Sequence, residues 1–217
     1  MIWRMVEVQI ESIEAPLLES AQAASLALSL VARAQTMGFL PLREGRVELD
    51  REFLGELAEL LRRRGVASRA TASLAHAMQA EPLNDVELID ALRATLDAVD
   101  ASPHPEGEWP PARELLGDEL LARLLRISAS SLRRYAAGHR HTPDEVAWRL
   151  HLVARLLAAL VGSYNDYGIR RWFERRRSAL DGGTPAELLE RAEGEDDERL
   201  ERVLAIAEQL TGAGAAA

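Results

Sequence analysis

Apolar residues recur along most of this chain at spacings of three and four residues, which is the period of an amphipathic α-helix. Only Val6, Val8 and Ile10 alternate with polar residues in the way that a half-buried strand does. The pattern therefore predicts an all-α protein with one short strand at most. The helices that it predicts cover residues 16–38, 51–64, 68–80, 86–99, 113–125, 129–138, 143–162, 166–177 and 197–210.

Short polar residues mark where several of these helices begin. A Ser, Thr, Asp or Asn before the first turn can accept hydrogen bonds from N–H groups that have no partner inside the helix. The expected single-residue N-caps are Asp50, Asp85, Ser128 and Asn165. The segments 142–145 and 184–187, both of the form Thr-Pro-x-Glu, are expected to be capping boxes with Pro in the first helical position.

The segment 100–111 contains four Pro and a Gly in twelve residues, so it is predicted to be a non-helical linker between two domains. Residues 1–105, which end in this linker, form the first expected domain, and dimerisation or partner docking is its default role. Residues 106–142 and 143–210 form the second part, and the Gly/Ala-rich tail 211–217 is expected to be disordered.

Charge is distributed unevenly around a net value of −9. Residues 123–177 carry 12 Arg and four acidic residues, a net charge of +8, whereas residues 178–217 carry three Arg and ten acidic residues, a net charge of −7. A basic segment between acidic ends fits a local surface for a polyanion. The equally acceptable alternative is that these arginines neutralise neighbouring acidic helices.

The absence of Cys excludes disulfides and thiol chemistry. The apolar runs are too short to cross a membrane, and the first residues lack the pattern of a signal peptide. We therefore expect a cytoplasmic protein that does not bind a membrane.

The segment 116–138 has the pattern of a helix-turn-helix. Its apolar positions would face inward on both helices, with Ser128 starting the second helix. The outward face of that helix would present short polar residues and Arg, which suit contacts to bases and phosphates. The candidate DNA-binding residues are Ser130, Ser131, Arg133, Arg134 and Arg140. The alternative is an ordinary amphipathic helix pair whose arginines are only solvated.

The segment 168–177 is the densest cluster of basic and aromatic residues. Trp and Arg together are typical of the central residues of protein interfaces. The alternative, which we favour for Trp172, is that the aromatic residues belong to the core. The candidate partner-binding residues here are Arg170, Arg171, Trp172 and Arg175.

Nothing in the sequence predicts an enzyme, a cofactor or a metal site. His139 and His141 lack further ligands at a suitable spacing, and His151 is expected to be a packing residue on a helix. No nucleophile–base set, phosphate-binding loop or dinucleotide-binding glycine pattern is present. The acidic run 195–198 is most simply a solvated helix start.

Four separated motifs in order resemble the Xre/MbcA/ParS antitoxin family, and most closely its MbcA-like branch. They are the helix-turn-helix at 120–138, the segment 140–151, the segment 162–173 with its Gly-Ser-Tyr-Asn-Asp-Tyr-Gly start, and the segment 180–189 with Gly-Gly-Thr-Pro. The resemblance covers about residues 109–210, roughly half of the chain.

The resemblance implies a non-enzymatic antitoxin that blocks an NAD-degrading RES-domain toxin and represses its own operon through operator DNA. Residues 143–210 would be the toxin-binding domain. The protein would form a homodimer or a higher hetero-oligomer with the toxin. Added candidate toxin-binding residues are Glu195, Asp196, Asp197 and Arg199. Residues 1–100 have no counterpart in short family members, and 189–203 is more acidic and lacks the family's aromatic residue. The alternative function is a transcription regulator without a toxin.

Overall fold

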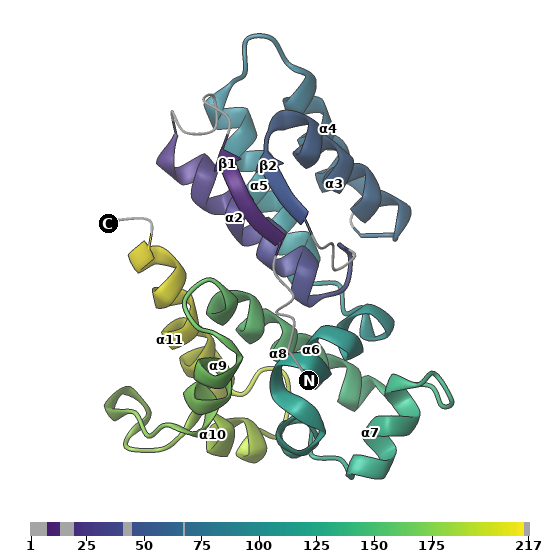
Figure 1. Cartoon of the computed structure of the whole chain (residues 1–217), viewed down its shortest axis with the longest axis vertical. Helices are drawn as coiled ribbons and strands as arrows, with labels where there is room; N and C mark the ends of the chain where they lie inside the picture. Colours follow the sequence, from purple (N-terminus) through teal and green to yellow (C-terminus); the bar gives the residue numbers. More distant parts are fainter. Residues whose placement is uncertain (1–7, 14–19, 41–44, 67, 215–217) are drawn as a thin grey trace. The chain divides into compact units, whose positions relative to one another are not determined.

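The computed structural model describes residues 8–13, 20–40, 45–66 and 68–214, and these residues are predominantly helical (Figure 1). The all-α prediction is therefore confirmed. The contacts within the chain divide it into two compact units, which we call the N-terminal unit (residues 1–102) and the C-terminal unit (residues 103–217). Among the described residues, no helix combines the length and apolar character that a membrane span requires.

The N-terminal unit contains β1 (Val8–Ile13), α2 (Ala21–Thr36), β2 (Gly45–Leu49), α3 (Arg51–Arg63), α4 (Ser68–Gln79) and α5 (Asp85–Asp100). The helix α5 packs against both α2 and α4, and α4 also packs against α3. The strands β1 and β2 lie side by side as a two-stranded parallel sheet (Figure 1). An ion pair between Arg33 Nε and Asp100 Oδ1, at 2.8 Å, joins the ends of α2 and α5.

Local sequence patterns predicted this unit well, with three corrections. Asp50 caps α3 as expected, but Asn84 and not Asp85 caps α5, because its Oδ1 accepts from the first free N–H groups. Helix α2 begins at Ala21 with Ser20 as its cap, while residues 16–19 of the predicted helix lie outside the described residues. The strand pattern at Val8 and Ile10 is confirmed, Val6 lies outside the described residues, and β2 was not predicted.

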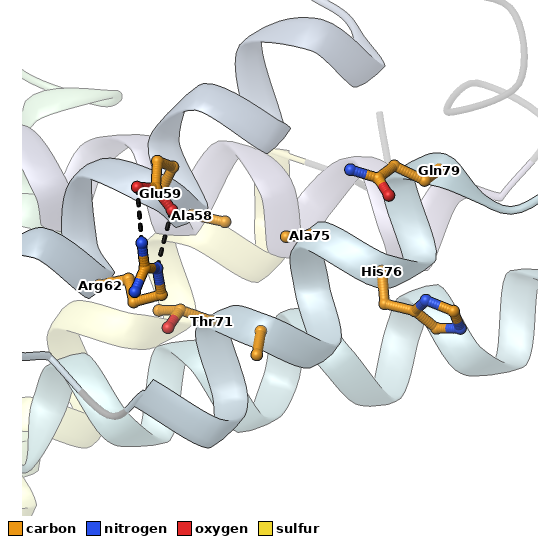
Figure 2. A pocket seen from close by; sticks show the side chains of 8 residues that line it. Ala58, Glu59, Arg62, Thr71, Ala75, His76 and Gln79 are labelled. Carbon is orange, nitrogen blue, oxygen red and sulfur yellow. Dashed lines mark hydrogen bonds and ion pairs between the residues drawn. The ribbon is translucent and has the colours of Figure 1, made fainter.

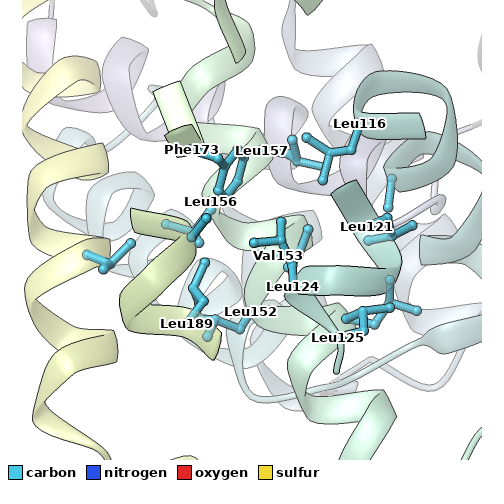
Figure 3. Close-up of a cluster of buried hydrophobic side chains, with 14 of the residues drawn as sticks. Leu116, Leu121, Leu124, Leu125, Leu152, Val153, Leu156, Leu157, Phe173 and Leu189 are labelled. Atoms are coloured by element: carbon cyan, nitrogen blue, oxygen red, sulfur yellow. The ribbon is translucent and has the colours of Figure 1, made fainter. Parts of the chain in front are cut away.

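The C-terminal unit contains α6 (Pro105–Leu124), α7 (Ala129–Ala136), α8 (Asp144–Val161), α9 (Asp166–Glu174), the short 3₁₀ helix η1 (Ser178–Leu180), α10 (Pro185–Arg191) and α11 (Glu198–Gly214). The helix α8 packs against α6, α9 and α11, and α6 also packs against α7, α9 and α10. The buried side chains of these helices form one hydrophobic cluster that extends from Trp109 in α6 to Ala207 in α11. Figure 3 shows part of this cluster, including Leu116, Val153 and Leu189.

The predicted non-helical linker at 100–111 is confirmed only for residues 101–104, between α5 and α6, and is wrong for residues 105–111, because α6 begins at Pro105. Pro105 is compatible with the first helical turn, because the N–H that it lacks would have no partner inside the helix there. Pro110 and Pro111 lie further inside the helix, where the missing N–H groups cost backbone hydrogen bonds. Burial of the Trp109 side chain in the core, where it is 2% exposed, outweighs the cost of these two prolines to the helix. A kink at Gly117, whose φ is 76°, separates this first part of α6 from residues 118–124.

Of the two expected capping boxes, only one is confirmed. The Thr184 hydroxyl accepts from the N–H of Glu187, and the Glu187 carboxylate accepts from the N–H of Thr184. The Thr142 box is wrong: α8 has Pro143 as its N-cap without a side-chain hydrogen bond. The Thr142 hydroxyl instead accepts from the indole N–H of Trp109 at 3.1 Å, because satisfying a buried indole takes precedence.

Two helix ends also differ from the prediction. Helix α9 ends at Glu174 and not at residue 177, because Arg175 takes an extended conformation. Helix α11 continues to Gly214, so residues 211–214 of the predicted disordered tail are helical, while residues 215–217 lie outside the described residues.

Candidate DNA-binding and partner-binding surfaces

The second part of α6 and helix α7 form the predicted helix-turn-helix, although the first helix covers 118–124 and not 113–125. Arg126 in the turn has a φ of 55°, a conformation that usually favours Gly. The turn is closed by the N–H of Ile127, which donates to the Ala122 carbonyl at 3.0 Å. Ser128 caps α7 as predicted, because its hydroxyl accepts from the N–H of Ser131 at 3.1 Å.

Helix α7 buries one face and exposes the other, as its spacing predicted. Leu132 and Tyr135 are buried, and the Tyr135 ring stacks on Trp109 with ring centroids 6.3 Å apart. Ser130, Arg133 and Arg134 are exposed on the opposite face, and Ser131 is half-buried beside the cap. Arg140 is exposed beyond the helix, with its guanidinium 5.6 Å from the Tyr135 ring centroid. Four of the five candidate DNA-binding residues are thus accessible on or next to α7.

The arginines of α7 are available to a ligand. Within the described part of the chain, the side chains of Arg133 and Arg134 form no hydrogen bond or ion pair. The charge of Arg133 affects one carboxylate, that of Asp118, whose pKa is lowered mainly by its hydrogen bond to Arg113 and less by the charge of Arg133. Because Arg113 binds Asp118 at 2.8 Å, the negative charge of Asp118 is largely neutralised by a residue other than Arg133.

The predicted basic-aromatic cluster divides into structural and exposed residues. Trp172 is 2% exposed and packs edge-on against Phe173, so it belongs to the core and not to an accessible surface. Arg177 lies over the Trp172 ring at 4.7 Å. Arg170 donates to the Leu115 carbonyl at 2.8 Å and thereby joins α9 to α6. These contacts give Arg170 and Trp172 structural roles.

The exposed side of α9 and the segment just before it each carry a tyrosine that the sequence interpretation did not select. Tyr164 and Tyr167 are 37% and 62% exposed. The Arg171 guanidinium lies 5.8 Å from the Tyr167 ring centroid and donates to its hydroxyl at 3.3 Å, and Arg175 is exposed beyond the helix end. We call these four residues the α9 patch. Part of this patch could have been predicted from the sequence, because Tyr167 and Arg171 are four residues apart and therefore share one face of the helix. The buried residues Ile169, Trp172 and Phe173 lie on the other face.

The acidic run before α11 also divides in two. Glu195 and Asp196 are exposed. The Asp197 carboxylate instead accepts from the N–H groups of Arg199 and Glu193, at 3.0 and 3.1 Å. Both backbone hydrogen bonds lower the pKa of Asp197, and the one from the N–H of Arg199 has the larger effect. Arg199 in turn donates to the Arg191 carbonyl at 2.9 Å, so the predicted site residues Asp197 and Arg199 form the connection between α10 and α11.

Two arginines bind the carbonyl groups at the end of α10. Arg149, which is 2% exposed, donates to the Leu189 carbonyl at 3.0 Å and to the Ala192 carbonyl at 2.6 Å. Arg126 from the turn donates to the same Ala192 oxygen at 3.2 Å. Positive charge at a helix C-terminus is favourable. Burial is the main cause that lowers the pKa of Arg149, followed by the nearby charge of Arg126.

A buried acid–base pair fastens the start of α6 to α8. Glu108 is fully buried, and its Oε1 lies 2.6 Å from Nδ1 of His151, which is 5% exposed. The same oxygen accepts from the N–H of His104 at 3.1 Å. The prediction that His151 is a packing residue is therefore confirmed.

The N-terminal unit has a shallow cavity of about 280 Å³ between α3 and α4 (Figure 2). The guanidinium of Arg62 binds both carboxylate oxygens of Glu59 at 2.8 Å, and this hydrogen-bonded pair lowers the pKa of Glu59. His76 and Gln79 lie further along α4, away from that pair (Figure 2). Because the polar groups do not converge and alanines form much of the lining, the cavity does not assemble a catalytic set.

His139 and His141 are exposed. Over residues 8–13, 20–40, 45–66 and 68–214, no group of three His, Cys, Asp or Glu side chains is placed to hold a metal ion. Comparison of the chain with models of protein families, with curated proteins and with solved structures finds no match.

Proposed function

We propose that this chain is an antitoxin that binds DNA through α7 and a toxin through the exposed parts of α9 and the acidic run before α11. The proposal that this chain binds DNA rests on one observation, the outward face of α7. It combines Ser130 near the helix start with Arg133 and Arg134, whose side chains have no partner within the described residues. Short polar residues suit base edges, and unpaired arginines suit phosphate or guanine.

The toxin-binding half rests on the sequence motifs of residues 120–189 and on two exposed surfaces. The α9 patch offers aromatic rings and arginines, the composition of interface centres. Glu195 and Asp196 offer negative charge. An NAD-degrading site must attract a doubly phosphorylated dinucleotide, so a basic site is expected, and acidic residues would guide docking to it. The RES-domain toxin is therefore the partner that we propose.

The first prediction tests DNA binding. Arg133→Ala combined with Arg134→Ala should weaken binding to the DNA upstream of the chain's own reading frame by about tenfold or more, because two phosphate or base contacts are lost. The salt dependence should also flatten, by up to about two in the slope of log K against log salt. A gel-shift titration at several salt concentrations measures both.

The matched control is Arg63→Ala with Arg64→Ala, which removes the same charge from exposed positions at the end of α3. That variant should bind DNA like the unchanged chain. Equal affinity and an equal salt slope for the two double variants would show that α7 is only a scaffold.

The second prediction tests toxin binding. Co-expression of a RES-type toxin with the full chain should restore growth, and Tyr167→Ala combined with Arg171→Ala should abolish the rescue. The Arg133→Ala, Arg134→Ala variant should still rescue, because α7 is a different surface. Glu195→Gln with Asp196→Asn should weaken rescue if charge guides docking, and should have no effect if shape alone blocks the toxin.

The alternative, a transcription regulator without a toxin, makes a different prediction for the same strains. It expects DNA binding through α7 but no rescue by any form of the chain, including the unchanged one. It also expects no reading frame of RES type beside this one.

A further inference from the structure

The segment that follows α9 carries two arginines on the same side. Arg175 and Arg177 both have an extended backbone conformation, and side chains two positions apart in an extended segment point to the same side. The N–H of Arg177 donates to the Gly183 carbonyl at 3.0 Å, and its carbonyl accepts from the N–H of Gly182 at 3.0 Å. The guanidinium of Arg176 donates to the Gly182 carbonyl at 3.2 Å. Arg175 and Arg177 therefore form a pair on a segment that backbone hydrogen bonds hold in place.

No acidic residue compensates the charge of this pair. Over residues 68–214, which the structure describes without a gap and which include every helix packed against α9, neither Arg175 nor Arg177 forms an ion pair or a side-chain hydrogen bond. Burial is the main cause that lowers the pKa of Arg177; the phenol of Tyr164 opposes this effect and the like charge of Arg175 adds to it. The three side chains thus lie close enough to act on one another, as a cluster of donors with two positive charges.

Trp172 supports this cluster from the core. The guanidinium of Arg177 lies 4.7 Å from the centroid of the Trp172 ring, a contact with the face of the ring that uses no N–H group. Both Nε of Arg177 and Nε1 of Trp172 are buried, and neither has a hydrogen-bond partner among the described residues. Buried N–H groups nearly always have an acceptor. Two unpartnered donors in contacting residues, beside uncompensated charges, are the features of a site for an anionic acceptor.

We propose that Arg175, Arg177 and Tyr164 bind the phosphate group of a small anionic ligand. A phosphate group carries a charge of about −2 near neutral pH and three strong acceptor oxygens, which match two guanidinium groups and one hydroxyl. A carboxylate carries half that charge and leaves one arginine uncompensated. Trp172 is a positioning residue, because it holds the Arg177 guanidinium over its ring and stays in the core. This site goes beyond the proposed function, since neither DNA nor toxin takes part in the binding.

The experiment titrates the nitrogen-15-labelled full chain with sodium phosphate at about pH 7.5, above the second pKa of a phosphate group. Ionic strength is kept constant with sodium chloride. The NMR signals of the Arg177 Nε–H and the Trp172 indole N–H should both shift, with a dissociation constant of about 1 mM. Sodium chloride alone should leave both signals in place.

Three substitutions test the residues of the site. Arg175→Gln and Arg177→Gln should each raise the dissociation constant for phosphate by about tenfold or more, because each removes a charged donor. Tyr164→Phe, which removes only a hydroxyl at an exposed position, should raise it by roughly threefold. Because Arg175 is exposed, its substitution tests the site even if the Arg177 variant does not fold.

Adenosine 5′-monophosphate and adenosine distinguish the source of the phosphate group. Equal affinities for the monophosphate and inorganic phosphate would identify the ligand as free phosphate. Tighter binding of the monophosphate, still weakened by Arg175→Gln, would identify a nucleotide whose base adds contacts. Adenosine that binds as tightly as its monophosphate would overturn the proposal, because the phosphate group would then contribute nothing.

The matched control is Arg191→Gln, which removes the same charge from an exposed position at the end of α10. This variant should bind phosphate like the unchanged chain. Signals that do not move at about 20 mM phosphate, far above the expected dissociation constant, would overturn the proposal. So would equal affinities of the Arg175→Gln and Arg191→Gln variants, which would reduce the effect to general charge attraction. Because no DNA or toxin is present, either result leaves the proposed function untouched.

Discussion

Replacement of Arg149 by Ala is expected to lower the free energy of unfolding of the C-terminal unit by about 3 kcal/mol. The substitution removes two hydrogen bonds from a charged donor, to the carbonyls of Leu189 and Ala192, and leaves space beneath α10. Arg149 also lies over the Trp148 ring at 4.4 Å, a contact that a shorter side chain loses. The burial that lowers the pKa of Arg149 offsets part of this stabilisation.

Urea denaturation followed by tryptophan fluorescence is suited to this measurement, because three of the four tryptophans, Trp109, Trp148 and Trp172, lie in the C-terminal unit. Arg149→Lys should be only partly tolerated, since one ammonium cannot reproduce the two-pronged geometry of a guanidinium. Arg126→Ala, at an exposed position, provides the control and should cost about 1 kcal/mol. Equal stability of the Arg149→Ala and Arg126→Ala variants would contradict the role assigned to Arg149.

Removal of the Glu108 carboxylate is expected to have a similarly large effect. Glu108→Ala deletes one partner of a buried pair and should lower the free energy of unfolding by about 3 kcal/mol. The reason is that the imidazole of His151 stays buried after its Nδ1 has lost the Glu108 carboxylate. The N–H of His104 loses its acceptor as well. The start of α6 should exchange its amide hydrogens faster as a result.

Glu106→Ala is the matched control, two residues earlier in the same helical turn and exposed, and it should change stability by less than about 0.5 kcal/mol. A double variant with Leu at positions 108 and 151 should recover part of the stability, because an apolar pair of suitable volume avoids the desolvation of both partners. If Glu108→Ala and Glu106→Ala unfold at the same urea concentration, the buried pair does not hold α6.

Much of the fold was predictable because helix periodicity is a local property of the sequence. Leu54, Leu57 and Leu61 in α3 are buried as their spacing required, and α7 exposes the face that the pattern assigned to solvent. The strand β2 was missed because its five residues contain too short an alternation to stand out.

The errors arose where tertiary contacts override local rules. The prolines of 100–111 predicted a linker, yet Trp109 and Glu108 bury their side chains there and hold a helix in place. Thr142 has the pattern of a cap but binds the indole of Trp109 instead. The binding of Ala192 by Arg149 joins residues 43 positions apart and leaves no local trace in the sequence.

The candidate surfaces were predictable in part for a related reason. Exposure follows from helix phase, so the accessible face of α7 could be inferred before the structure. The contacts that remove Arg170, Asp197 and Arg199 from the list of freely accessible residues depend on neighbouring segments, and no pattern within one helix could reveal them.

The hydrogen bond from Arg126 to Ala192 determines how this protein can be engineered. Since the turn of the helix-turn-helix is anchored to the far end of α10, residues 118–138 are not a portable cassette that could be grafted onto another scaffold. A chain cut at residue 142 would also expose the apolar cluster that α6 shares with α8 and α11. The smallest transplantable piece is therefore residues 103–214, and a chimera designed at any internal boundary should yield an unstable product.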